Sequence, residues 1–126
     1  MNDQTLIETA EHYAAAGLRR LARVNEKQAK RLTDNPEAML DWSELRERAR
    51  AQAQALIGAD LRSILDRSRA DDPDAVDVHA EAIRRYARRS IHWVRTPTST
   101  DATSNALDSI LNDERMDFAR STGVLD

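Results

Sequence analysis

Hydrophobic residues recur every three or four positions along most of the chain, which is the spacing of one face of an α-helix. The first such stretch begins near Asp3 or Thr5 and runs to about Leu32. It ends before Pro36, because proline disfavours the helical conformation in the residue that precedes it. Gly17 falls on the same face, and we interpret it as the mark of a close helix crossing. The hydrophobic face of this predicted helix consists of Leu6, Ile7, Ala10, Tyr13, Ala14, Leu18, Leu21, Val24 and Leu32.

A second helix is predicted from Asp41 or Ser43 to about residue 69. The sequence "DWSE" places an aspartate three residues before a glutamate, the arrangement of a capping box. Trp42 follows a loop and precedes this helix, so we interpret it as a core anchor or as one partner of a hydrophobic staple. Gly58, inside the helix, indicates either a bend or a tight contact with a neighbour.

The acidic, proline-containing sequence "ADDPDAV" predicts the start of a third helix, with Asp72 as its N-cap and Pro73 as its first residue. This helix continues to about Val94. Its narrow hydrophobic face follows a spacing of four and three residues. The face consists of Val76, Ala80, Ile83, Ala87, Ser90 and Val94.

A fourth helix is predicted from Thr103 or Ser104 to Ser121, with Gly123 just after its end. Four amphipathic helices must bury their hydrophobic faces against one another. We therefore expect an all-α fold, a compact bundle of about four to five helices in which residues 1–126 form a single domain. The hydrophobic face of the fourth helix consists of Ala106 or Leu107, Ile110, Leu111 and Phe118.

The composition agrees with a helical fold and excludes several kinds of site. Glycine and proline occur three times each, and aromatic residues make up 4% of the chain, which favours helices over sheets. The absence of cysteine excludes disulfides, zinc–thiolate sites and a thiol nucleophile. No hydrophobic run approaches the roughly 20 residues that cross a bilayer, and the N-terminal residues lack the basic start of a signal peptide. We expect a cytoplasmic protein without membrane contact.

No catalytic or metal-binding pattern stands out in the sequence. Glu8 and His12 lie one helical turn apart, but the Glu-x-x-His pairs that build dimetal sites in helical bundles are missing. The remaining histidines, His79 and His92, have no ligand-like spacing to other histidines or carboxylates. There is also no glycine-rich phosphate loop and no dinucleotide fingerprint. We expect a protein that is not an enzyme and has no cofactor, no metal ion and no small-molecule substrate.

Positive charge is concentrated in two blocks, although the net charge of the chain is −3. Residues 19–31 and residues 84–95 each carry a net charge of +5, and the rest of the chain is acidic. Soluble helical proteins ordinarily mix charges of both signs along each helix, so separate blocks of one sign call for a functional interpretation.

At about 100° per residue, the arginines of the third helix fan across the side opposite its hydrophobic face. Tyr86 and Trp93 fall together at the edge between the two sides, where either ring is available to stack on a nucleic-acid base. Residues 19–31 of the first helix form a ridge of cations spaced four residues apart. Within this block, Glu26 alone offsets their charge. The predicted nucleic-acid contacts are Arg19, Arg20, Arg23, Lys27, Lys30, Arg31, Arg84, Arg85, Arg88, Arg89, His92, Trp93 and Arg95.

Three interpretations of this positive charge are open. The arginines are a solvated surface neutralised by the acids of residues 32–83, or they contact the phosphates of an RNA or DNA strand, or they meet an acidic protein. A free-standing nucleic-acid-binding domain is usually basic overall. The acidic total therefore favours one subunit of an assembly, with nucleic acid, other protein subunits and copies of itself as partners.

The sequences "GLRRLARVNEKQAKR" and "EAIRRYARRSIHWVR", in a helical chain without cysteine or a catalytic constellation, resemble the small subunits of class 1 CRISPR effector complexes. The resemblance is one of general character over the whole chain. It implies a role in antiviral defence, with several copies stacked along a filament of guide-binding subunits. The copies would line the path of the guide–target duplex or the displaced strand. The implied backbone contacts are Arg84, Arg85, Arg88 and Arg89 with Arg19, Arg20, Arg23 and Lys27.

The alternative is a structural or adaptor protein, such as a subunit of a phage particle or a regulator. In that case the basic faces bind acidic protein surfaces, and Tyr86 and Trp93 anchor the interface. A helix-turn-helix repressor fits less well, because no short glycine-containing turn between two short helices precedes the basic segment.

Overall fold

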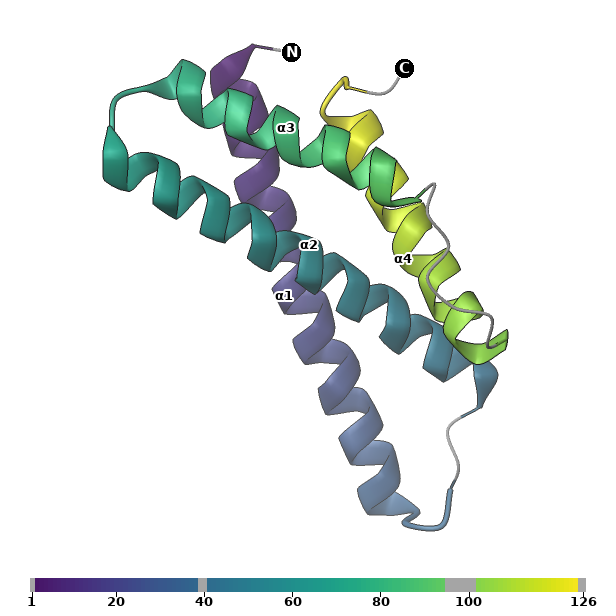
Figure 1. The fold of residues 1–126 in the computed structure, drawn as a ribbon. Helices are drawn as coiled ribbons and strands as arrows, with labels where there is room; N and C mark the ends of the chain where they lie inside the picture. Colours follow the sequence, from purple (N-terminus) through teal and green to yellow (C-terminus); the bar gives the residue numbers. More distant parts are fainter. Residues whose placement is uncertain (1, 39–40, 95–101, 125–126) are drawn as a thin grey trace.

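The computed structural model describes residues 2–38, 41–94 and 102–124, with the side chains of residues 93–94 and 102–107 left out. Within these ranges the chain forms four α-helices and no strand (Figure 1). The expectation of an all-α fold with four to five helices is confirmed. The helices are α1 (Asp3–Asp34), α2 (Trp42–Asp71), α3 (Val76–Val94) and α4 (Ala102–Ser121).

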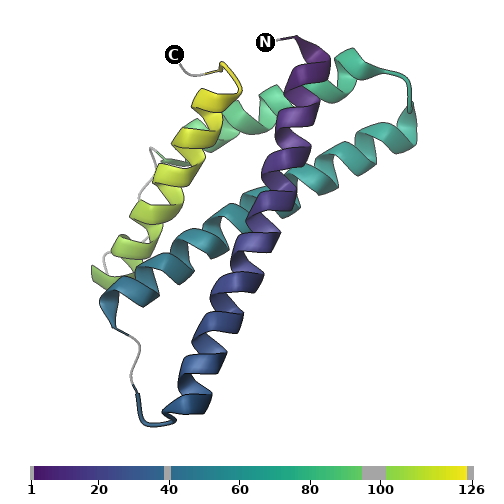
Figure 2. The same cartoon turned by 180° about the vertical axis from the view of Figure 1, so that it is seen from behind.

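The two long helices, α1 and α2, cross near their middles and share the most extensive contact of any helix pair. From a short turn at the end of α2, α3 runs back across the first half of α1 (Figures 1 and 2). α4 packs against both α2 and α3. The N- and C-termini consequently lie at the same end of the molecule.

The boundaries of the long helices follow from local side-chain chemistry. α1 ends at Asp34, just before the asparagine that precedes Pro36, as the restriction on residues before proline requires. Asp41 caps α2, because its Oδ1 accepts a hydrogen bond of 2.8 Å from the backbone N–H of Glu44. Both predicted boundaries are confirmed.

The predicted N-cap of α3 is wrong, because α3 begins at Val76 rather than directly after Asp72. Asp72 instead ends α2, where its backbone N–H bonds to the carbonyl of Ser68 at 3.3 Å. Its side-chain Oδ1 accepts the N–H of Asp74 at 3.1 Å, which closes a local turn around Pro73. The aspartate thus stabilises the turn between two helices instead of the first turn of the second one.

The core of the molecule centres on Phe118, which reaches in from α4 and is 1% exposed. The ring of Tyr13 lies 5.3 Å from it and that of Tyr86 lies 6.1 Å from it, measured between centroids. These tilted and edge-on contacts are favourable arrangements for aromatic pairs. The other members of the core cluster are Leu6, Ile7, Ala10, Ile57, Leu61, Leu65, Ala80, Ile83 and Ala87.

Several hydrophobic positions that the spacing assigned to the core are exposed. Leu18 and Leu32 are 42% and 37% exposed, because α2 crosses α1 instead of covering its whole hydrophobic face. Val76 is exposed because it is the first residue of α3. Trp42 is 53% exposed, so its interpretation as a core anchor is wrong. The side chains of Val94, Ala106 and Leu107 lie outside the described ones.

The crossing of α1 and α2 depends on two glycines. A Cβ atom added to Gly17 would lie 2.7 Å from the backbone oxygen of Gln54, and one added to Gly58 would lie 2.8 Å from the Cα of Ala14. Neither distance is tolerated between these atoms, and backbone cannot swing aside as a flexible side chain does. Gly58 therefore provides a tight contact, which settles the choice between contact and bend.

Replacing Gly58 by alanine should lower the free energy of unfolding by about 1–3 kcal/mol, the range for overpacking a well-packed core. Urea denaturation followed by circular dichroism measures this quantity. The control Ser63→Ala changes an exposed position of the same helix and should stay within about 0.5 kcal/mol. Alanine has the higher helix propensity, so a Gly58→Ala variant as stable as the native chain or more so would show that the crossing is not tight.

Candidate nucleic-acid interface

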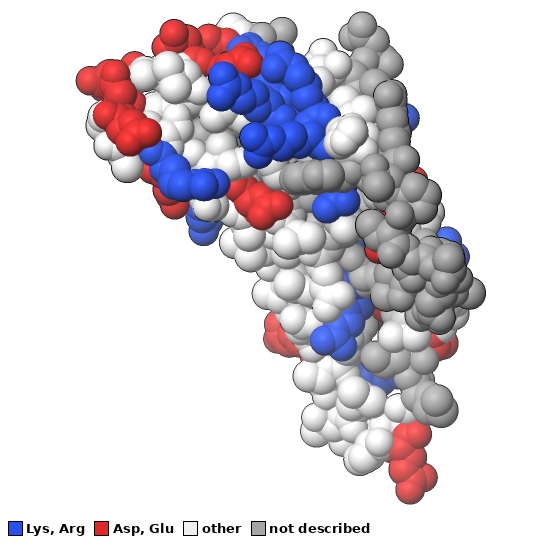
Figure 3. Space-filling model, in the orientation of Figure 1, with Lys and Arg blue, Asp and Glu red and all other residues white. Residues whose placement is uncertain are grey.

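Basic side chains gather on the outward side of α3. Ala80 and Ile83 point into the core with no exposed surface, whereas Arg85 and Arg88 on the other side are 72% and 55% exposed. In Figure 3 the lysine and arginine side chains form a group over α3, and acidic side chains lie near the start of that helix. We define the α3 basic face by its exposed residues Arg85, Arg88, Arg89 and His92.

Among the described residues, a single carboxylate partly neutralises this face. Glu81 accepts a hydrogen bond from Nη1 of Arg88 at 3.0 Å, and Nε of Arg85 lies 4.0 Å from the same carboxylate oxygen. No hydrogen bond or ion pair reaches Arg89 within the part of the chain that the structure describes. Exposed ion pairs of this kind are weak and exchange readily. The α3 basic face therefore retains more positive than negative charge among the described residues.

Three of the predicted contact residues have partners on other helices. Nη2 of Arg84 donates to Oδ1 of Asp3 at 2.7 Å, which joins α3 to the start of α1. Nη1 of Arg20 donates to the side-chain oxygen of Gln54 at 2.9 Å. Arg31 forms an ion pair with Glu44, so that it too joins α1 to α2. These three cations contribute to contacts between helices.

The other predicted contact residues on α1 are exposed, namely Arg19, Arg23, Lys27 and Lys30. They lie on the half of α1 beyond its crossing with α2, whereas α3 lies beside the first half of α1 (Figures 1 and 2). The two positive blocks of the sequence are therefore separate surfaces at different ends of the molecule.

One aromatic residue of the basic segment, Tyr86, differs from the prediction. Tyr86 is 5% exposed, and its hydroxyl donates to Oδ2 of Asp60 at 2.9 Å. It cannot stack on a base or anchor an interface, because Phe118 of α4 packs against its ring. The side chain of Trp93 and all of Arg95 lie outside the described residues.

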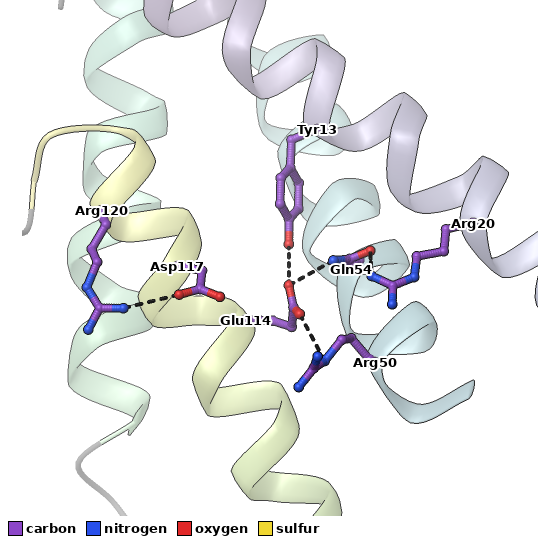
Figure 4. Close-up of polar contacts among 7 residues, drawn as sticks. All are labelled: Tyr13, Arg20, Arg50, Gln54, Glu114, Asp117 and Arg120. Atoms are coloured by element: carbon purple, nitrogen blue, oxygen red, sulfur yellow. Dashed lines mark hydrogen bonds and ion pairs between the residues drawn. The ribbon is translucent and has the colours of Figure 1, made fainter. Parts of the chain in front are cut away.

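A buried carboxylate, Glu114, was not singled out by the sequence. Its carboxylate accepts hydrogen bonds from the hydroxyl of Tyr13 at 3.4 Å and from Nε2 of Gln54 at 3.1 Å, and Nε of Arg50 lies 3.5 Å away (Figure 4). One group thereby joins α4 to both α1 and α2. The signal was its position four residues before Phe118, because a glutamate on a hydrophobic helix face needs buried partners.

His79 is a second buried polar residue, and it supports the turn between α2 and α3. It is 2% exposed, with Nδ1 lying 2.5 Å from Oγ of Ser68 and Nε2 lying 3.4 Å from the carbonyl oxygen of Pro73. The ring thus contacts both the end of α2 and the turn that follows it.

The described residues offer anion-binding groups but no cluster of ligands for a metal ion. Among them, no three histidine, aspartate or glutamate side chains lie close enough together to hold one. None of the helices in these ranges is long and apolar enough to cross a membrane. No protein-family model matches the chain, and no curated protein and no solved structure matches it significantly.

The two tyrosines of the chain, Tyr13 and Tyr86, should make its stability fall at alkaline pH. Burial raises the pKa of both above the ordinary value of about 10, and the neighbouring carboxylates of Glu114 and Asp60 raise it further. The folded protein therefore keeps protons that the unfolded chain releases. The contribution of the protonated tyrosines to the free energy of unfolding is complete below about pH 10. It should be lost progressively above that pH.

Urea denaturation at a series of pH values from about 8 to about 11 measures this effect, since the range brackets the ordinary tyrosine pKa. The double variant Tyr13→Phe/Tyr86→Phe should show a flatter decline than the native chain, because neither phenylalanine titrates. An equally steep decline in the variant would assign the pH dependence to other groups.

Proposed function

We propose that this protein is a non-catalytic helical subunit of a nucleoprotein complex, and that it contacts the nucleic-acid backbone through the α3 basic face. The observation that carries the proposal is the set of exposed arginines on one side of α3, with Glu81 as their shared carboxylate. The guanidinium group binds phosphate through parallel N–H donors and remains charged at any physiological pH.

The spacing along α3 suits successive phosphates of one strand. Arg85, Arg88 and His92 lie three and four residues apart, which is about 5 Å along the helix for each step, and Arg89 stands beside them. If three arginines each contact one phosphate of a single strand, the logarithm of affinity should fall against that of salt with a slope of about −2. The strand is RNA or DNA, because backbone contacts do not distinguish the two.

Two leucines of α2 are exposed to solvent. Leu45 and Leu56 of α2 are 41% and 47% exposed, and their eleven-residue separation puts them on the same side of the helix. Both side chains are therefore accessible on one side of α2 to other protein subunits or to copies of this chain. The proposed type of subunit is the small subunit of a class 1 CRISPR effector complex, which the sequence resembles.

The triple variant Arg85→Glu/Arg88→Glu/Arg89→Glu should bind oligonucleotides at least tenfold more weakly than the native protein, because three phosphate contacts become repulsive. Fluorescence anisotropy with labelled single- and double-stranded oligonucleotides at two salt concentrations measures the loss. The matched control is Arg48→Glu/Arg62→Glu/Arg67→Glu, which makes the same charge change at three exposed positions of α2.

A small effect of the control beside a large effect of the α3 variant would support the proposal. Equal losses in both triple variants would mean that total charge, rather than this face, governs binding. Absence of binding by the native protein at both salt concentrations would favour the alternative function, in which the basic face meets an acidic protein surface.

A further inference from the structure

A further positively charged site lies at the beginning of α2. Here the surface is hollowed by a volume of about 360 Å³, to which α1, α2 and α4 all contribute. Volumes of this size are typical of sites for small ligands. The hollow is lined by Arg20, Trp42, Ser43, Arg46, Glu47, Arg50 and Ile110.

Two of its three arginines are oriented by buried or half-buried neighbours. Arg20 uses Nη1 to donate to Gln54, and Arg50 lies with Nε 3.5 Å from the carboxylate of Glu114 (Figure 4). Their remaining guanidinium nitrogens have no further partner among the described residues. Each side chain is thus held by one end of its guanidinium group while other donors stay open, which is the preorganisation that a ligand site needs.

The charge of the hollow is unbalanced. Arg46 is exposed and has no hydrogen bond or ion pair in the described part of the chain. Glu47 is the one acid of the lining, and Glu114 beneath it faces Arg50. Three guanidinium groups near two carboxylates leave an excess of positive charge, which favours an anion in the hollow.

Trp42 supplies a flat apolar wall to the same hollow. More than half of its surface is exposed, and it takes no part in the core cluster. Ile110 adds a second apolar contribution from α4. A tryptophan beside arginines suits a ligand that carries both a planar ring and a negative charge.

We propose that this hollow binds one nucleotide, with the phosphate on Arg20, Arg46 and Arg50 and the base against the indole ring of Trp42. Arginines select phosphate geometry, and an exposed aromatic ring stacks on any base. The nucleotide is either free in solution or the terminal unit of a strand, since both present the same chemistry. The site is separate from the α3 basic face and does not depend on it.

The test is a titration of the isotope-labelled full-length protein, followed by nuclear magnetic resonance. The chain has two tryptophans, so the Trp42→Phe variant assigns the indole N–H signal of Trp42. The probes are inorganic phosphate, nucleoside 5′-monophosphates and single-stranded oligonucleotides with a 5′-phosphate. A nucleoside monophosphate should shift the Trp42 signal and bind at least tenfold more tightly than phosphate alone.

Matched variants then locate the site. Arg46→Glu and Trp42→Ala should each weaken binding of the monophosphate at least tenfold, and neither removes a side-chain hydrogen bond or an ion pair among the described residues. The control Arg48→Glu makes the same charge change on the same helix outside the hollow and should leave the affinity within about twofold, as expected for a screened surface charge. Tighter binding of the oligonucleotide would identify a strand end as the ligand, and tighter binding of the monophosphate a free nucleotide.

Two results would overturn the proposal: no shift of the Trp42 signal with any probe, or equal weakening by Arg46→Glu and Arg48→Glu. The triple α3 variant separates this site from the proposed function. This variant should lose strand binding along the α3 basic face while it keeps its affinity for the monophosphate. Each proposal can therefore be refuted without the other.

Discussion

The close crossing of α1 and α2 is the contact on which the rest of the structure depends. Gly17 meets the backbone of Gln54, and Gly58 meets the backbone of Ala14, so the two helices touch without side chains between them. A close approach at one point lets two long helices diverge on either side of it. On one side of the crossing, α3 lies across the first half of α1. On the other side, the second half of α1 carries its exposed cations.

The polar contacts around Glu114 follow from this crossing. Because α2 passes close to α1 at Gln54, the side chains of Tyr13, Gln54 and Arg50 all reach the same point on α4. A buried carboxylate is unfavourable without partners, and these donors offset the loss of its hydration. The same contacts orient Arg50, and Gln54 in turn orients Arg20, so the packing of the helices also shapes the charged hollow.

The cations of the chain fall into two groups that the sequence does not separate. Arg20, Arg31 and Arg84 join helices through polar partners, whereas the arginines of the α3 basic face have open donors or share one exposed carboxylate. Part of the acidic surplus is used in the same way, through Asp3 and Glu44. An acidic net charge is therefore compatible with a locally basic surface, because charges act over distances of about 10 Å or less in physiological salt.

The sequence by itself determined the helical class, the end of α1, the start of α2, the inward positions Ala80, Ile83, Ala87 and Ser90 of α3 and the outward direction of Arg85, Arg88 and Arg89. These features depend on capping residues, proline and the period of 3.6 residues, all of which act within a few positions along the chain. Only the tertiary structure decided that Tyr86 is buried, that Trp42 is exposed and that Gly58 makes a contact. The physical reason is that each outcome depends on which residues of a distant helix lie opposite, and helix periodicity contains no information about that.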